Sequence, residues 1–378
     1  MVATMIAGSL SNDFDYTTHP VIIAMLWASI TGECDVYYLY DHVQRINRPP
    51  GEYNYWPSEQ KMRALLKSGK VYINHYTAGA SNHSKFILIQ SFQELGYQYF
   101  AQSGDNLIAQ TSGNNYWGDR TKWNDILLSH GDKKIFYVYE WSFWHLWNLG
   151  NENDDEIDNE NEDKNFPHPI YSSNGVTVFF TPSTARSILM PPKSYSLDEK
   201  ELCVKEGSCV TCTRTNPFAV QLFRLKKGVG TRIQLAIAFW DTNDACTKEV
   251  LGLLLEHHKA GSTIQAIVSN SPAKAKWADL AYAWFEKHTI KSSIRKGPMH
   301  NKYMILSGPV LSGIEILNPL DKTKWTYSSP KTILLTGSLN LENWGMTESI
   351  MVVDVTKEWD VRQSYLANFS YQWKQSAP

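Results

Sequence analysis

Two places in the sequence carry a histidine and a lysine two positions apart, each directly ahead of an apolar run. The pairs are His83 with Lys85 and His300 with Lys302. If each run is a strand, side chains two apart point to the same side, so each pair would present an imidazole beside an ammonium. Histidine can attack or transfer a proton near neutral pH, and a fixed cation can stabilise the charge of a phosphoryl group. The pairs therefore predict chemistry on a phosphate.

A Ser-x-Asn sequence follows each apolar run and supplies neutral hydrogen-bond donors for phosphate oxygens. The donors are Ser112 and Asn114 in the first copy and Ser338 and Asn340 in the second. An acidic residue stands beyond each of them, Asp125 in the first copy and Glu348 in the second. Because a carboxylate can accept a hydrogen bond from an imidazole and fix its tautomer, we predict that Asp125 and Glu348 orient the two histidines.

A single His-x-Lys or His-x-Arg tripeptide carries no information in this chain. With eleven His and thirty-six Lys and Arg residues, about one is expected by chance. The tripeptide His257-His258-Lys259 is an example, since it has no Ser-x-Asn sequel, and we assign it to the surface of a predicted helix. Chance does not supply the whole series twice, in matching places.

An acidic segment separates the two copies. Residues 151–165 hold eight acidic side chains and almost no apolar ones, so they cannot bury enough surface to offset the entropy lost on ordering. This composition is typical of a solvated linker. We therefore divide the chain into an N-terminal half (1–150), the acidic linker (151–165) and a C-terminal half (166–378).

Strands alternate with helices in both halves. In the first half the pattern predicts strands at 2–7, 35–40 and 71–76 and helices at 21–30 and 59–68. In the second half it predicts strands at 176–180, 233–240 and 263–269 and helices at 218–227 and 247–260. Taken in order, the strand at 176–180 corresponds to the strand at 2–7. The alternation predicts an α/β fold of two similar α/β/α lobes with mixed sheets.

The composition is that of a globular protein and excludes several other classes. Of the 378 residues, 43% are hydrophobic and 20% charged, and the net charge is −2, unlike that of a strongly basic protein that coats duplex nucleic acid. No run reaches about 18 apolar residues, so we expect no stable membrane span. Residues 1–10 lack the cationic start of a secretory signal.

The cysteines and one glycosylation pattern bear on location. Five cysteines are an odd number for a secreted disulfide framework. Cys209 and Cys212 have the spacing of zinc ligands, but no second pair follows at a suitable interval, so we predict no metal site. Asn82-His83-Ser84 fits the N-glycosylation pattern and contains a candidate catalytic histidine. These features favour the cytoplasm or a host cytosol.

The duplicated series resembles the HKD motif of the phospholipase D superfamily, which is followed by a later Gly-Ser-x-Asn. The second copy, HNKYMIL followed by TGSLN, is the closer match. The family's aspartate, five residues after the lysine, is replaced here by Gln90 and Ser307, and the glycine of the first Gly-Ser-x-Asn by Thr111. The resemblance implies a phospholipase D-like fold, with two halves that share one site about a pseudo-twofold axis.

The resemblance also implies a mechanism for a phosphodiesterase. His83 would attack phosphorus and form a phosphohistidine, while His300 would protonate the leaving oxygen and later activate water. Lys85 and Lys302, together with the serines and asparagines, would surround the phosphate. Because lysines stabilise the charge, the mechanism requires no metal ion or other cofactor.

The substrate stays open between classes. The near-neutral charge and an aromatic content of 13% favour phospholipase D-type hydrolysis of a phospholipid. The alternative is a metal-independent nuclease acting on DNA or RNA, for which basic residues interleaved with aromatic ones ahead of His300 would form a groove. These residues are Lys274, Lys276, Lys287, Lys291, Arg295 and Lys296, with Trp277, Tyr282 and Trp284. A catalytically degenerate scaffold is the third alternative, and the sequence predicts no particular oligomeric state.

Overall fold

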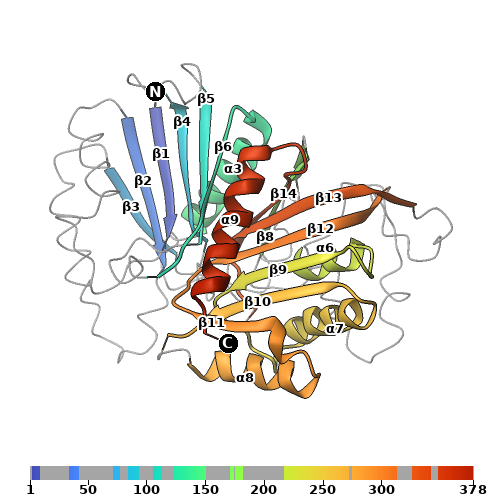
Figure 1. Cartoon of the computed structure of the whole chain (residues 1–378). Helices are drawn as coiled ribbons and strands as arrows, with labels where there is room; N and C mark the ends of the chain where they lie inside the picture. Colours follow the sequence, from blue (N-terminus) through green and yellow to red (C-terminus); the bar gives the residue numbers. More distant parts are fainter. Residues whose placement is uncertain are drawn as a thin grey trace, which may run out of the picture. The chain divides into compact units, whose positions relative to one another are not determined.

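The computed structural model describes twelve stretches of the chain. They are residues 2–8, 34–41, 71–76, 84–92, 105–112, 122–149, 171–173, 175–181, 217–271, 275–312, 326–341 and 348–377. The chain forms two compact units. The first contains residues 1–167, 337–339 and 345–349, and the second contains residues 168–336, 340–344 and 350–378. Each unit is built on one β-sheet (Figure 1).

The first unit holds a six-stranded mixed sheet with strand order β3-β2-β1-β4-β5-β6. Its strands are β1 (Val2–Gly8), β2 (Cys34–Asp41), β3 (Val71–Tyr76), β4 (Phe86–Phe92), β5 (Asp105–Thr111) and β6 (Ile126–His130). The first three run parallel, and β4, β5 and β6 continue the sheet in antiparallel pairs. Because β4 pairs with β1, the apolar run that follows Lys85 lies in the middle of the sheet.

Helix α3 (Lys133–Leu149) follows β6 and packs on this sheet. It begins after Asp132, whose side chain accepts a hydrogen bond from the backbone N–H of Ile135 at 3.1 Å. The buried ring of Tyr139 meets Phe86 of β4 edge-on, with 5.1 Å between the ring centroids. The helix therefore supports the strand of the first motif.

The second unit holds an eight-stranded sheet with strand order β11-β10-β9-β12-β13-β14-β8-β7. Its strands are β7 (Tyr171–Ser173), β8 (Val176–Thr181), β9 (Arg232–Ile237), β10 (Thr263–Ser269), β11 (Ile294–Gly297), β12 (Lys302–Ser312), β13 (Thr326–Gly337) and β14 (Glu348–Asp354). The strands β9, β10 and β11 run parallel, and β12 is antiparallel to both of its neighbours, β9 and β13. The predicted α/β class with mixed sheets is confirmed.

Six neighbouring strands have the same order in the two sheets. The series β3-β2-β1-β4-β5-β6 corresponds to β11-β10-β9-β12-β13-β14. The predicted correspondence between strands 176–180 and 2–7 is wrong, because β8 lies beyond β14 and β9 takes the place of β1. Alternation of helices and strands along a sequence does not reveal which edge of a sheet an added strand joins. Matching the elements in order from the linker therefore displaces the predicted second copy by one strand.

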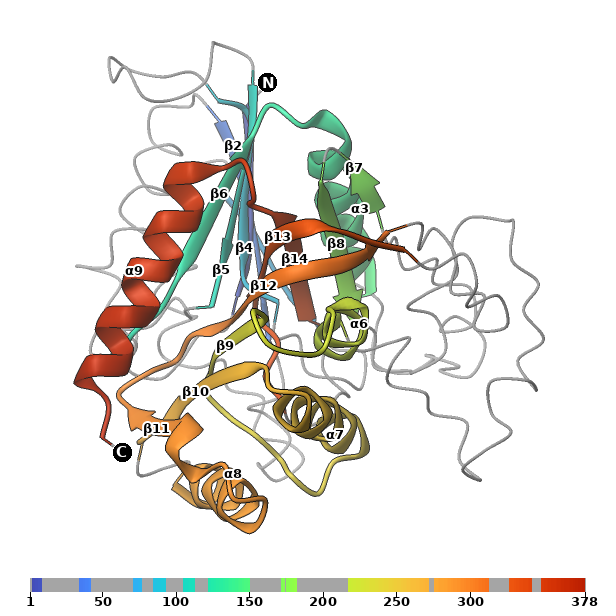
Figure 2. The same cartoon turned by 45° about the vertical axis from the view of Figure 1, so that its right-hand side comes forward.

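The described residues of the second unit include four α-helices. They are α6 (Pro217–Arg224), α7 (Ala245–Lys259), α8 (Ala275–Lys287) and α9 (Trp359–Gln375). Figure 2 shows α9 on one face of the sheet and α6 and α7 on the other. The helix α9 follows β14 as α3 follows β6, so the two copies also match in their last helix.

Helix α7 has start and stop signals in its own sequence. Asp244 accepts a hydrogen bond from the backbone N–H of Thr247 at 2.9 Å and caps the first turn. Gly261 adopts a positive φ of 92° after the last turn, and its N–H donates to the carbonyl of His258 at 2.9 Å. The helix therefore ends within one residue of the predicted limit at 260.

His257 does not lie on the surface of α7, so that prediction is wrong for this residue. Its side chain is buried, with Nε2 3.0 Å from the carbonyl oxygen of Leu222 and Nδ1 3.2 Å from Oγ of Ser262. Burial lowers the pKa of His257, although the hydrogen bond with Leu222 opposes this shift. Successive side chains of a helix point about 100° apart. Within the tripeptide, His258 and Lys259 are therefore exposed while His257 is not.

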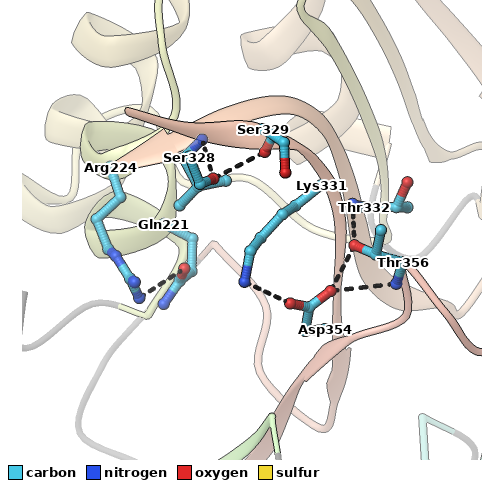
Figure 3. Close-up of polar contacts among 9 residues, drawn as sticks. Gln221, Arg224, Ser328, Ser329, Lys331, Thr332, Asp354 and Thr356 are labelled. Carbon is cyan, nitrogen blue, oxygen red and sulfur yellow. Dashed lines mark hydrogen bonds and ion pairs between the residues drawn. The ribbon is translucent and has the colours of Figure 1, made fainter. Parts of the chain in front are cut away.

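Polar contacts fix the end of β14 against β13 (Figure 3). Nζ of Lys331 lies 2.7 Å from Oδ2 of Asp354. The N–H of Thr356 donates to Oδ1 of Asp354 at 3.1 Å, and its hydroxyl accepts from the N–H of Thr332 at 2.9 Å. Burial would raise the pKa of Asp354, but the hydrogen bonds from Lys331 and Thr356 outweigh it, so the pKa lies below its ordinary value.

Several predictions fall outside the described residues. They are the helices at 21–30 and 59–68, the linker at 151–165 and the cysteines Cys203, Cys209 and Cys212. The domain limits at residues 150 and 166 also fall there and remain predictions. Among the residues that the structure does describe, no helix has both the length and the apolar character needed to cross a membrane.

Candidate active site

The second His-x-Lys motif leads into β12, with Lys302 as the first residue of the strand and His300 two residues ahead of it. His300 and Lys302 are both buried, with exposures of 4% and 0%. Nζ of Lys302 lies 3.2 Å from Nε2 and 3.3 Å from Nδ1 of His300, and it donates to the His300 carbonyl oxygen at 2.8 Å. The spacing of two residues therefore brings the imidazole and the ammonium together, as the sequence predicts.

This contact places a group that can transfer a proton or attack an electrophile beside a fixed cation. An imidazole can do either near neutral pH. The adjacent ammonium attracts an anionic group. The ring of Phe239 packs edge-on beside His300, with 6.1 Å between the centroids. The site thus combines a reactive group with a buried positive charge.

Asn340 lies in a short segment that is anchored next to His300. The N–H of Leu341 donates to the carbonyl of Phe239 at 3.0 Å, and the hydroxyl of Thr247 donates to the carbonyl of Leu341 at 2.9 Å. Phe239 also contacts the His300 ring. Phe239 therefore contacts both the segment that contains Asn340 and the ring of His300. Asn340 itself is buried.

Only part of the first motif is described. His83 and Asn114 lie outside the described residues, and their roles remain predictions. Lys85 is buried, with an exposure of 1%. Its carbonyl oxygen accepts hydrogen bonds from the N–H of Thr111 and from Nε2 of Gln110, both at 3.0 Å. The backbone of Lys85 is therefore fixed to the neighbouring strand β5.

Ser112 and Ser338 make the same backbone contacts in the two copies. The N–H of Ser112 donates to the carbonyl of Asp125 at 3.1 Å, and its Oγ accepts from the N–H of Asp125 at 2.9 Å. Ser338 makes both contacts with Ser349, each at 2.9 Å. The two serines therefore extend the pairing of β5 with β6 and of β13 with β14. Their predicted contacts with a phosphate remain predictions.

The serine contacts identify equivalent backbone positions. Ser349 takes the position in the second copy that Asp125 has in the first. The sequence had predicted Glu348, one residue earlier, as the counterpart of Asp125. The two acids were paired because each stands beyond the Ser-x-Asn sequence of its copy. Ser349 is identified only by the register of β13 with β14, which neither strand's own sequence sets. The side chain of Glu348 lies outside the described residues, so its role in orienting His300 remains a prediction.

The two motifs offer cations and neutral donors. Their described groups include Lys85 in the first unit and Lys302 and Asn340 in the second, all of them buried. Within the described stretches, no three His, Cys, Asp or Glu side chains are grouped so that they could hold a metal ion. A mechanism without a metal or cofactor stays a prediction that chelation tests.

The basic residues ahead of His300 are partly engaged within the protein. The guanidinium of Arg295 lies 4.5 Å from the ring centroid of Trp373 and donates to the Trp373 carbonyl at 2.6 Å. Nζ of Lys296 lies 2.7 Å from Oδ1 of Asp279. Lys274 and the side chain of Lys291 lie outside the described residues.

Comparisons with known proteins bear on the fold. The sequence matches no family model and no curated protein. The structure is similar to phosphatidylserine synthase from Haemophilus influenzae Rd KW20, with a TM-score of 0.54 and 10% identity over 98% of this chain and 81% of the other. It is also similar to polyphosphate kinase from Porphyromonas gingivalis, with a TM-score of 0.48 and 12% identity over 98% of this chain and 45% of the other. This chain thus spans less than half of that kinase.

A third solved structure is Nuc from Salmonella typhimurium, a phospholipase D family member, with a TM-score of 0.29 and 14% identity over 42% of this chain and 86% of the other. The likeness to phosphatidylserine synthase and the repeated strand order show that the chain has the phospholipase D superfamily fold. The motif resemblance is confirmed at the level of the fold. Function must be argued from the site residues, because one fold serves many activities.

Proposed function

We propose that this protein is a phosphodiesterase in which His83 and His300 act on one phosphate diester. His83 attacks phosphorus and forms a phosphohistidine, and the leaving oxygen takes its proton from His300. His300 then removes a proton from the water that attacks the phosphohistidine, which releases the product and restores both histidines. Lys85 and Lys302 stabilise the charge on the non-bridging oxygens.

One observation supports this proposal above the others, the contact between the buried His300 and the buried Lys302, with 3.2 Å between Nζ and Nε2. Burying an ammonium costs solvation free energy, and a phosphate bound beside it would offset part of that cost. The same spacing recurs at His83 and Lys85, and Lys85 is buried as well.

For the substrate, we favour a phospholipid and hydrolysis of the phospholipase D type. Binding a nucleic acid backbone needs several cations that are free to contact phosphates. Arg295 and Lys296 instead contact Trp373 and Asp279, and the net charge of the chain is −2. The fold is also that of a phosphatidylserine synthase, an enzyme named for a lipid.

A metal-independent nuclease is the second candidate, and the surface of α8 favours it. Lys276 is exposed and lies 5.6 Å from the ring centroid of Trp277. Trp284 contacts His288, with 4.4 Å between the ring centroids. Cations interleaved with aromatic rings can bind single-stranded nucleic acid by stacking and charge. A degenerate scaffold, the third candidate, would turn over no diester.

The deciding experiment incubates the full chain in EDTA with phosphatidylcholine vesicles, plasmid DNA and single-stranded DNA. We expect hydrolysis of the lipid by the wild type and none by His300→Asn. His258→Asn is the matched control, because His258 is an exposed histidine of α7, and this variant should keep full activity. Activity that is lost in EDTA and restored by a divalent ion would contradict the metal-independent mechanism.

The other outcomes separate the candidates. Cleavage of DNA without lipid hydrolysis would replace the lipid assignment with the nuclease. No turnover of any of the three substrates would favour the scaffold. If His300→Asn were as active as the wild type on any of them, His300 would not be catalytic.

A further inference from the structure

Each unit contains a buried hydrogen bond between a tyrosine and a glutamine that joins a sheet to its last helix. In the first unit, the hydroxyl of Tyr139 on α3 donates to Oε1 of Gln110 on β5 at 2.8 Å. In the second unit, the hydroxyl of Tyr303 on β12 donates to Oε1 of Gln372 on α9 at 3.1 Å. All four side chains have exposures of 0% or 1%.

The glutamine of each pair also contacts a His-x-Lys motif. Nε2 of Gln110 donates to the carbonyl oxygen of Lys85 at 3.0 Å. Nε2 of Gln372 lies 3.5 Å from Oδ1 of Asn301, the residue between His300 and Lys302. In both units the amide therefore links a tyrosine hydroxyl on one side to the motif on the other.

The two pairs place the same residue types on opposite elements. In the first unit the tyrosine comes from the helix and the glutamine from a strand, whereas in the second unit the tyrosine comes from the strand and the glutamine from the helix. An apolar pair of the same volume would fill either space without burying any polar group. Burial of a polar group costs free energy unless the group is hydrogen-bonded. The hydrogen bond, and not a particular side chain at a particular place, is what the two copies share.

We propose that Tyr139–Gln110 and Tyr303–Gln372 are positioning pairs that fix the two His-x-Lys motifs for catalysis, the first through the carbonyl of Lys85 and the second through the side chain of Asn301. This proposal rests on the proposed phosphodiesterase function. The pairs do not touch substrate. They hold Lys85 and the residue next to His300 in one orientation, since a fully hydrogen-bonded amide has one favourable placement.

A loss of position should appear in the chemical step. A displacement of about 1 Å at a catalytic group can cost about a hundredfold in rate. Tyr303→Phe and Tyr139→Phe remove only a hydroxyl and keep the ring packing, so both variants should fold. For each we expect kcat to fall about tenfold or more while KM changes less than about twofold.

Thr231→Val is the control for the tyrosines, because it removes a buried hydroxyl and keeps the side-chain volume. The hydroxyl of Thr231 donates to the carbonyl of Lys226 at 2.7 Å and has no contact with either motif among the described residues. For Gln110→Met and Gln372→Met the control is Gln234→Met, because Gln234 is buried in β9 and donates to Gln265 at 3.0 Å. The controls should lower the melting temperature as much as the test variants but leave kcat unchanged.

A second readout does not depend on turnover. In protein labelled with ¹⁵N at histidine, the imidazole signals of His300 are recorded in the wild type, Tyr303→Phe and Thr231→Val. We expect the His300 signals to change in Tyr303→Phe only. Unchanged His300 signals in Tyr303→Phe, or a kcat no lower than in the controls, would overturn the positioning role. A wild type that turns over no diester would instead count against the proposed function, and the NMR comparison would still decide the positioning role.

Discussion

His257 and His300 are both buried, yet only His300 contacts a lysine. His257 lies between a backbone carbonyl and the hydroxyl of Ser262, whereas His300 lies against the ammonium of Lys302. The first environment satisfies both ring nitrogens within the protein and leaves no group for a substrate. The second holds a charge that a phosphate can neutralise. The neighbours of the two histidines, and not their burial, therefore separate the structural role of His257 from the catalytic role that we propose for His300.

The buried His257 should make the protein less stable in mild acid. Burial lowers the pKa of His257 in the folded state, so the unfolded chain binds the proton more readily. The stability that follows from this shift is present above the ordinary pKa of about 6.5 and is lost as the pH falls below it. Melting temperatures measured between about pH 8 and about pH 5 should therefore fall more steeply for the wild type than for His257→Gln.

The exposed neighbour provides the control for this measurement. His258→Gln should follow the wild type at every pH, because His258 is exposed. If His257→Gln lost stability with the same slope as the wild type, the burial of His257 would not be a source of the acid sensitivity.

At the residue scale, local geometry was predictable and register was not. The contact of His300 with Lys302 was predictable because side chains two apart in an extended chain point to the same side. The apolar run after Lys302 indicates such an extended chain. The position of Ser349 opposite Ser338 depends on how β13 pairs with β14, and nothing in either strand's own sequence sets that register. The buried Gln372 belongs to a helix far along the chain, so no spacing rule connects it with Asn301.

At the scale of elements, the structure agrees best with the sequence where turn residues bound a short apolar run. The strands β3 and β10 have the predicted limits at 71–76 and 263–269. The helices α3 and α9 were not predicted, since their aromatic residues are spread around the helix and do not form one clear stripe. Packing on the sheets, which a single segment does not encode, decides their conformation.

One helix end carries a strained residue. After α8, Thr289 adopts a positive φ of 61°, where glycine is the usual residue. Its N–H donates to the carbonyl of Glu286 at 3.0 Å, and the N–H of Ile290 donates to the carbonyl of Phe285 at 2.9 Å, so the turn is well formed. The strain therefore comes from the β-branched side chain and not from missing hydrogen bonds.

Thr289→Gly should stabilise the protein. Removing the β-branched side chain relieves the left-handed strain, and we expect the free energy of unfolding to rise by about 0.5 to 1 kcal/mol after the entropic cost of glycine is counted. Urea unfolding measures the change. Thr289→Ala keeps a Cβ atom and should gain less than Thr289→Gly. A glycine variant less stable than the wild type would contradict the interpretation of the turn as strained.

At the scale of the whole molecule, the chain contains the same six-strand arrangement twice and places one His-x-Lys motif in each copy. The duplication was predictable, because a series of several motifs in matching order is far more specific than any one of them. Its alignment was not, because β7 and β8 extend only the second sheet. The sequence of an added strand does not indicate which edge of the sheet the strand joins.

If the two copies serve one reaction, their histidines should fail as a unit. We expect His83→Asn and His300→Asn each to lower turnover by about three orders of magnitude, and the double variant to be little worse than either single one. Turnover of a soluble chromogenic phosphodiester, measured for the four proteins side by side, provides the comparison. Near-normal activity in either single variant would contradict the shared reaction.

The added strand has a consequence for how the chain is made. All the described strands of the first sheet end by His130, so they can pair while the second sheet is still on the ribosome. By contrast, β8 ends at Thr181 but pairs beside β14, which begins only at Glu348. During synthesis β8 must therefore wait, with an open edge, until β14 emerges. A product that stopped before Glu348 would keep that edge open, and open edges recruit other chains, so truncated forms would aggregate instead of persisting as a separate half.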